Sequence, residues 1–250
     1  MKFIKFLTLS AIGITLSANS FATETQVMIR AKAVDAKYIG TSVGGVKVVV
    51  EDAETGEILD QGWIKGDTGS TNTLIKDPIS RGQVLTDETT AGFLAKVDIT
   101  SPRLLRFKLI GPYAFRQSLQ EATVTSWVIP GKDILGDGIT LNIPGFIVDA
   151  WTNVLEGGHV EIFTKASMIC GCPIYPDGPW DPSNYEVQAI LMQNETKVSE
   201  VKLDFTGPVG IFSGKTTITK PGHYKAIVYI FDKKTGNVGV DRTMFEINAK

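Results

Sequence analysis

The chain has 250 residues, 43% of them hydrophobic, and its 25 basic and 27 acidic residues leave a formal charge of −2. That balance lacks the basic face with which proteins bind nucleic acid or anionic membrane surfaces, so both classes of partner are excluded. The length suits one large β-domain or two of ordinary size, and two cysteines are too few for a disulfide framework.

The first segment has the pattern of an export signal. Lys2 and Lys5 precede an apolar run over residues 6–16, and Ser20-Phe21-Ala22 places small side chains where signal peptidases cut. The run is too short to cross a bilayer, which takes roughly 20 residues. We therefore expect residues 1–22 to be a cleaved signal peptide and the mature protein to be periplasmic or secreted. Cleavage removes 22 residues and two lysines, leaving 228 residues with a formal charge of −4 and no transmembrane segment.

The next part of the chain predicts β-strands. Apolar residues alternate with polar ones, or form short runs between Gly, Pro, Asn and Asp, and no long stretch shows a helical period. The predicted strands of this part are 25–33, 43–51, 58–64, 93–99, 104–110, 122–129 and 139–143. Turns such as Glu54-Thr55-Gly56-Glu57 place a glycine where a hairpin needs positive φ.

One of these hairpins carries a resemblance. In Gly45–Ile64, the strand Val46–Val50 is followed by Asp52-Ala53-Glu54-Thr55-Gly56. This segment is similar to the opening hairpin of transthyretin-like or carboxypeptidase-regulatory-like sandwiches. The resemblance implies a β-sandwich for the first domain and assigns no functional residue.

A second motif follows the strand that ends at Ile64. Asp67-Thr68-Gly69-Ser70 resembles the catalytic loop of pepsin-like and retroviral-type aspartic proteases, in which the aspartate shares a proton with a second aspartate. Only one such loop is present, so catalysis by Asp67 would require a homodimer or a second, unrecognised carboxylate. Lys65-Gly66 also stand where that family has apolar residues. A plain surface loop is therefore the favoured interpretation, and a dimeric aspartic protease is the lesser alternative.

Two segments in the first part of the chain lack the alternating pattern of a strand. Residues 77–90 are polar and predict a long loop, which is often functional and often only mobile. Turn residues crowd between Pro130 and Gly145, where we expect a domain boundary. The predicted domains are residues 23–147 and 148–250.

Both cysteines lie together in Met168-Ile169-Cys170-Gly171-Cys172, after a predicted strand at 159–169. In an oxidising compartment the pair favours a disulfide, which is strained in so small a ring. Alternatively, Cys170 and Cys172 with Met168 bind Cu(I) or help to bind Zn(II). A redox-active or partner-linking thiol pair and two inert thiols are the remaining interpretations.

The only histidines, His159 and His223, each open a predicted strand. His159 is the better metal candidate, but an extended strand would hold it over about 30 Å from Cys170. Trp151, Trp180, Tyr175 and Tyr185 could form an aromatic platform, although Trp180 and Tyr185 are more simply explained as covering the sandwich edge.

The last part predicts strands at 185–192, 198–205, 223–231 and 238–247. The segment Pro221–Asp232 followed by Gly236-Asn237 resembles the last hairpin of bacterial Ig-like domains. This resemblance implies an Ig-like architecture for the second domain and no particular function. The expected fold is therefore all-β, with two antiparallel β-sandwich domains.

We expect a non-catalytic binding or structural module of the cell envelope, with a protein or envelope partner and the loop Met168–Trp180 as its functional locus. The alternative is a copper- or zinc-binding or thiol-redox protein that uses Cys170 and Cys172. No residue is predicted to be catalytic or to bind an organic cofactor, and the pattern predicts no oligomeric state.

Overall fold

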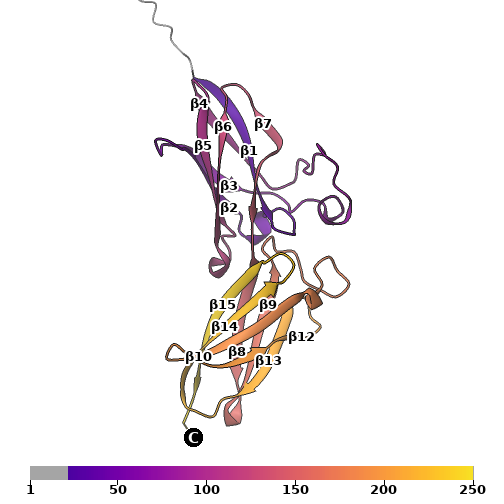
Figure 1. Ribbon diagram of the computed structural model, residues 1–250, viewed down its shortest axis with the longest axis vertical. Helices are drawn as coiled ribbons and strands as arrows, with labels where there is room; N and C mark the ends of the chain where they lie inside the picture. The colour runs from indigo at the N-terminus through magenta and orange to yellow at the C-terminus, as the bar shows by residue number, and fades with distance from the viewer. Residues whose placement is uncertain (1–21, 250) are drawn as a thin grey trace, which may run out of the picture.

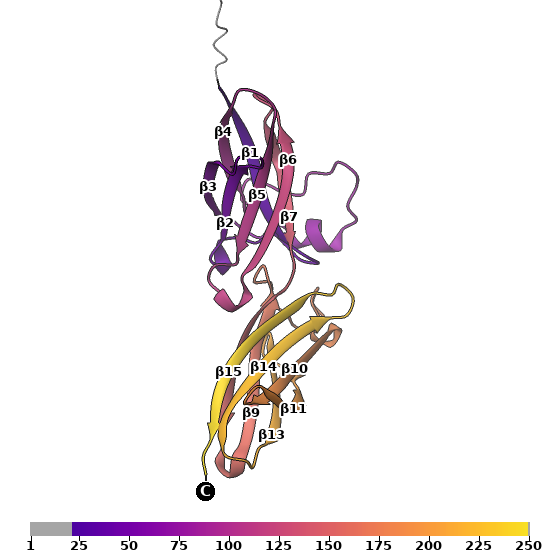
Figure 2. The same cartoon turned by 60° about the vertical axis from the view of Figure 1, so that its left-hand side comes forward.

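A computed structural model of the protein describes residues 22–249. It shows two groups of strands stacked along the long axis, with the first described strand at one end and the C-terminus at the other (Figures 1 and 2). The signal peptide predicted over residues 1–22 lies outside the described residues, apart from Ala22. No helix within residues 22–249 has the length and apolar character that a membrane crossing needs.

The first group of strands forms two facing sheets. One sheet has the order β4-β1-β7 and the other the order β3-β2-β5-β6. The strands are β1 (Thr23–Ala33), β2 (Val46–Asp52), β3 (Ile58–Ile64), β4 (Phe93–Ile99), β5 (Arg103–Gly111), β6 (Gln120–Val128) and β7 (Ile134–Ile143). The buried, alternate side chains of β1, β2 and β5 form the core between these sheets, as their period of two predicted.

One ladder departs from the antiparallel expectation. β1 pairs with β7 in parallel, while its other neighbour, β4, is antiparallel. The register of β1 against β7 shifts between Val27 and Ile29, where β7 carries Gly136 and Gly138 at positive φ. Two steps along β1 correspond to five along β7, so the irregularity adds three residues to β7 and bends it. β7 therefore begins earlier than the predicted strand at 139–143.

The second group also forms two facing sheets, β11-β10-β14-β15 and β12-β13-β9-β8. Its strands are β8 (Phe146–Val154), β9 (His159–Met168), β10 (Tyr185–Gln193), β11 (Thr196–Lys202), β12 (Asp204–Phe205), β13 (Ile211–Thr217), β14 (Gly222–Asp232) and β15 (Val238–Ile247). All of the ladders in this group are antiparallel. The all-β fold is therefore confirmed.

The single strand predicted at 198–205 is wrong in one respect, because the chain changes sheets within it. β11 pairs with β10, whereas Asp204 and Phe205 pair with β13 in the opposite sheet. Leu203 lies between them, and its N–H donates to the Val187 carbonyl at 2.9 Å. The change of sheet leaves β12 as a very short edge strand.

Helical structure is confined to short turns: η1 (Thr41–Val43), η2 (Asn72–Lys76), η3 (Arg116–Ser118), η4 (Glu156–Gly158) and η5 (Pro182–Asn184). The predicted hairpin turns are confirmed by positive φ at Gly56, Asn194 and Gly236. Glu195 also has a φ of 60°, so the turn after β10 uses two left-handed residues rather than one.

The two groups of strands contact each other through a buried junction. Strands β1–β7 pair only with one another, and so do β8–β15, but their buried apolar residues form one continuous cluster. Ser118 and Gln117 from η3 hydrogen-bond the backbone of Val148, at 3.4 and 2.9 Å. We keep the division into domains 23–147 and 148–250 as a proposal, noting that β8 begins at Phe146.

Candidate functional site

The cysteine pair forms a tight turn at the end of β9. The Gly171 N–H donates to the Met168 carbonyl at 2.7 Å, and the Met168 N–H donates to the Cys172 carbonyl at 3.0 Å. Gly171 has a φ of +81°, and a Cβ atom there would lie 2.8 Å from Cγ1 of Val43. A side chain at position 171 is therefore excluded both by the left-handed backbone and by contact with the first group of strands.

Both cysteines are buried free thiols in this structure. Burial opposes ionisation of Cys170, but a hydrogen bond from the Cys172 thiol and others from the Lys37 and Cys172 backbone N–H groups lower its pKa. The pKa of Cys172 is raised, because its thiol donates to Cys170 and because it is itself buried. Cys170 is thus the sulfur that accepts hydrogen bonds, and Cys172 holds its proton.

Lys37 is a residue of this site that sequence reasoning missed. Its backbone N–H and its ammonium both act to lower the pKa of Cys170. The Nζ atom of Lys37 also donates to the Gly69 carbonyl at 3.1 Å. Only the fold brings Lys37 to the cysteines, since the turn after β1 lies far from residue 170 in the sequence.

A cavity of about 300 Å³ lies beside the cysteine turn. Its lining includes Lys37, Thr68, Thr71, Cys170, Cys172 and Trp180. The loop that resembles an aspartic protease motif therefore meets the cysteine pair in space. Asp67 itself is exposed, and its backbone pairs with Thr89 and Ala91.

Two side chains of the second group hold the turn that follows β1. The indole N–H of buried Trp180 donates to the Asp35 carbonyl at 2.9 Å. The amide of buried Asn237 donates to the Val34 carbonyl at 3.1 Å and accepts from the Gly145 N–H at 3.2 Å. These two bonds, to the carbonyls of Asp35 and Val34, fix the turn to the second group of strands.

The candidate metal ligands do not gather around the cysteines. The Met168 sulfur accepts a hydrogen bond from the Tyr185 hydroxyl at 3.7 Å. His159 is exposed and contacts Thr217 at 3.0 Å, at the opposite end of β9 from the cysteine turn. His223 lies on β14, where its Nδ1 atom is 3.9 Å from the Oε2 atom of Glu246 on β15. Within the described part of the chain, no three His, Cys, Asp or Glu residues are grouped as metal ligands.

The four aromatic residues weighed as a platform are not gathered on one surface. Trp151 stacks on Phe163, with 5.4 Å between ring centroids, whereas Trp180 is buried at the junction. Tyr175 lines the cavity beside the cysteines, and Tyr185 lines a different one. Trp180 is buried and bonds to the Asp35 carbonyl of the first group of strands.

The larger cavity, about 640 Å³, lies away from the cysteine pair, between β10 and β12. The loop between Cys172 and Tyr185 separates the two cavities, because Trp180 lines the smaller one and Pro182 the larger one. The predicted locus Met168–Trp180 therefore borders the junction cavity, and through Pro176 it also reaches the larger cleft, which its continuation lines.

No protein-family model matches the chain, and no curated protein matches it. Among solved structures, the chain is similar to a DUF3823 family protein from Bacteroides ovatus ATCC 8483. The identity is 10%, the alignment covers 89% of this chain and 100% of that chain, and the TM-score is 0.34. A similarity at this level implies no ligand, partner or activity.

Proposed function

We propose that the protein is an exported, non-catalytic binding or structural module of the cell envelope. In this proposal residues 23–147 and 148–250 are two sandwich domains that act as one rigid body, and ligand or partner binding occurs at the cavity beside the cysteine turn. The export signal supports the location, and the junction supports the rigidity.

The observation that carries the proposal is the way the turn after β1 is held. Trp180 and Asn237, from two separate segments, donate to the carbonyls of Asp35 and Val34. Two directed hydrogen bonds on successive residues, beside a continuous buried apolar cluster, leave a hinge little freedom. A cavity whose walls come from both domains then keeps a fixed shape, which reduces the entropy lost on binding.

Export is tested by expressing the full chain in a bacterium and sequencing the N-terminus of the recovered protein. The mature protein should begin at Thr23 and leave the cell with the periplasmic or secreted fraction. An intact Met1 in the cytoplasmic fraction would overturn this part of the proposal.

Binding at the junction is tested by NMR on the indole N–H groups. Trp180 lines the junction cavity, whereas Trp151 stacks on Phe163 within β8 and β9. Peptidoglycan fragments, lipopolysaccharide and a detergent-solubilised envelope protein fraction serve as probes. A ligand at the junction should shift the Trp180 resonance and leave that of Trp151 in place. If none of the three probes shifts the Trp180 indole resonance, the proposed site would be contradicted.

Two adjacent, buried free thiols that line one cavity support a second candidate, a thiol-redox or copper-binding protein. Two adjacent sulfurs fit a two-coordinate Cu(I) ion, whereas structural zinc takes four ligands, which would have to include groups from another molecule. In an oxidising compartment the same pair could instead close as the expected disulfide.

Mass spectrometry and elemental analysis of protein purified from the periplasm separate these states. Alkylation of two thiols without reductant indicates the free pair, and alkylation only after reduction indicates the disulfide. Copper or zinc that is bound by the native protein and lost from Cys170→Ser would support a metal site. Metal content that is equal in both proteins would remove it.

The dimeric aspartic protease is retained as the lesser alternative. Its test is the hydrolysis of denatured casein at acidic pH by the wild type and by Asp67→Ala. Equal activity in both proteins, or none in either, would end the case for Asp67.

A further inference from the structure

The larger cleft lies where two sheet edges separate. Up to Lys202, β11 covers the edge of β10. Leu203 then crosses to the opposite sheet, and only Asp204 and Phe205 continue as β12. Beyond this crossing, residues 185–187 of β10 and residues 204–205 of β12 both border the cleft of about 640 Å³.

The backbone of Phe205 points into this cleft. The Thr206 N–H donates to the Ile211 carbonyl at 3.0 Å, so the backbone groups of Thr206 point toward β13. Those of Asp204, two residues earlier, point the same way. Residues alternate along a strand, so the N–H and C=O of Phe205 point away from β13. These Phe205 groups point in the same direction as the Leu203 N–H, which donates to the Val187 carbonyl of β10. β12 has no second neighbour in the described sheets.

The cleft combines an apolar floor with a charged rim. Leu203 and Phe212 are buried, and the half-buried ring of Phe205 packs edge-on against Phe212 with 5.6 Å between centroids. Two ion pairs lie on the rim: Lys202 with Asp204 at 2.6 Å, and Lys233 with Glu186 at 3.1 Å. With Asp181, the lining carries three carboxylates and two lysines, a mixture that does not favour a polyanion.

We propose that this cleft binds an extended peptide segment, which adds to the free edge of β12 through the N–H and C=O of Phe205. One apolar side chain of the peptide rests against Phe205 and Phe212. Backbone donors and acceptors directed into a groove with an apolar floor match an extended polypeptide, whose own backbone offers the complementary groups at the same spacing. This site is independent of the cysteine turn.

A random heptapeptide library panned on the immobilised mature protein tests the proposal. Selected peptides should bind the wild type at least tenfold more tightly than Phe205→Pro, which lacks the N–H. That N–H makes no bond within the described sheets, so proline is compatible with the edge position. Phe205→Ala is the matched control: it loses the ring, keeps the N–H, and should retain more affinity than the proline variant.

A second readout leaves the protein unchanged. Saturation with a selected peptide should slow hydrogen exchange of the Phe205 amide at least tenfold. Methylation of one peptide nitrogen should weaken binding by a similar factor, because it removes one hydrogen bond. The proposal is overturned if no peptide is enriched over Phe205→Pro, or if bound peptides leave Phe205 exchange unchanged. Cellohexaose is the competing probe, and its binding in the cleft without any peptide binding would indicate a saccharide site instead.

Discussion

At the scale of single residues, Asn237 shows how one side chain can join distant parts of the chain. Its amide satisfies the Val34 carbonyl in the first domain and the Gly145 N–H before β8. The side chain is 2% exposed, so water cannot readily replace either bond. Its role goes beyond closing the hairpin in which the Gly236-Asn237 turn was predicted.

The first prediction concerns Asn237→Ala. Loss of the amide leaves the buried Gly145 N–H and the partly buried Val34 carbonyl unpaired. Each such group costs about 1–3 kcal/mol, so the free energy of unfolding should fall by about 2–6 kcal/mol. Urea denaturation measures the change. Asn153→Ala, at an exposed position on β8, is the control and should stay within about 0.5 kcal/mol of the wild type. Equal stability of both variants would contradict the role of Asn237.

Arg30 performs a similar task within the first domain. The side chain is 5% exposed, and its guanidinium donates to the carbonyls of Thr90, Ala91 and Gly136. Asp137 completes the attachment by accepting from the backbone of Leu85 and Thr86. The end of the long loop predicted at 77–90 is therefore fastened to the bulge of β7.

The second prediction follows for Arg30→Met. The variant keeps an unbranched apolar side chain, shorter than that of arginine, but leaves three carbonyls without their donor, and should lose about 3 kcal/mol of stability or more. Trypsin should also cut faster after Arg81, because the loop end is released. Arg116→Met, at an exposed position in η3, provides the control. Wild-type cleavage rates in Arg30→Met would show that the loop is fixed by other contacts.

The local sequence pattern could identify the cysteine pair and the turn glycines, because each is defined by a few neighbouring residues. It could not identify Lys37, Asn237 or Arg30 as junction or anchoring residues. Each acts through a contact with a segment far away in the chain, and a single sequence carries no signal for such contacts. The same limit explains why the loop at Asp67 was not expected to meet the cysteines.

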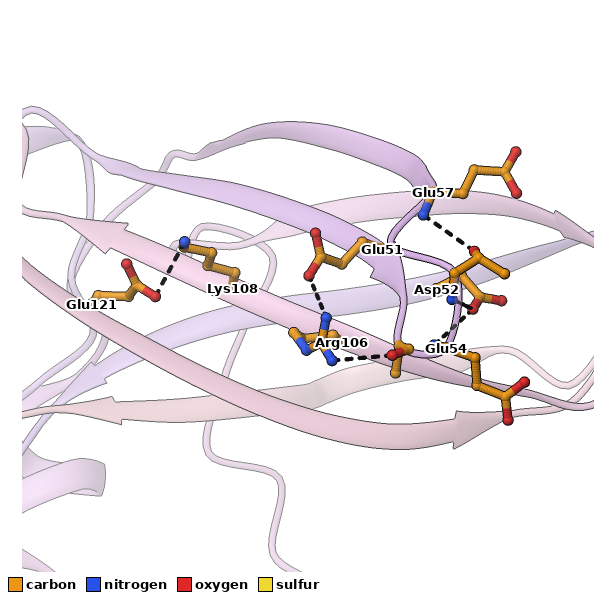
Figure 3. A network of polar contacts seen from close by, with 9 residues as sticks. Glu51, Asp52, Glu54, Glu57, Arg106, Lys108 and Glu121 are labelled. Carbon is orange, nitrogen blue, oxygen red and sulfur yellow. Dashed lines mark hydrogen bonds and ion pairs between the residues drawn. The ribbon is translucent and has the colours of Figure 1, made fainter.

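At the scale of elements, the β2–β3 turn contains a charge network (Figure 3). The Asp52 carboxylate accepts from the N–H groups of Glu54 and Thr55, at 2.9 and 2.8 Å, and pairs with Arg103 at 3.1 Å. The bond from Thr55 lowers the pKa of Asp52 most, against an opposing effect of burial. Glu51 with Arg106 and Lys108 with Glu121 form neighbouring ion pairs.

The third prediction is a pH dependence that Asp52→Asn removes. A carboxyl with a lowered pKa stabilises the fold above its unfolded pKa, about 3.9, and that contribution is lost as the pH falls through the folded value. The wild type should therefore exceed the variant in urea midpoint at pH 7, and the two should converge between about pH 4 and pH 2.

Arg103→Met separates the two kinds of contact that Asp52 makes. It removes the ion pair and keeps both backbone bonds, so it should weaken the pH dependence only partly. A constant difference between the wild type and Asp52→Asn at all pH values would refute the assignment to the Asp52 carboxylate.

The sequence pattern predicted the bounds of β3, β4 and β15 as observed. β4 buries alternate residues, whereas β3 buries only Ile64. The pattern did not identify β13, whose sequence Ile-Phe-Ser-Gly-Lys-Thr-Thr has few apolar side chains, or β8, which is buried at one end only. The change of sheet at Leu203 was also missed. Both sides of the change are extended, so the pattern continues through it while the pairing partner changes.

At the scale of the whole molecule, the junction determines whether the two domains unfold together. Their buried apolar residues are continuous, and Trp180 and Asn237 add directed bonds across the boundary. The fourth prediction is that the mature wild type unfolds in a single calorimetric transition. Trp180→Ala combined with Asn237→Ala should produce two transitions, because truncating a buried tryptophan alone costs about 3–5 kcal/mol.

The calorimetric result discriminates between one rigid body and two tethered domains. If the junction couples the domains, the calorimetric and van't Hoff enthalpies of the wild type should agree, and those of the double variant should not. Trp151→Ala, which removes a tryptophan outside the junction, is the matched control and should lower the transition temperature without splitting it. Two separate transitions in the wild type would show that the contacts around residues 34–37 do not couple the domains, and the proposed rigid module would then be wrong.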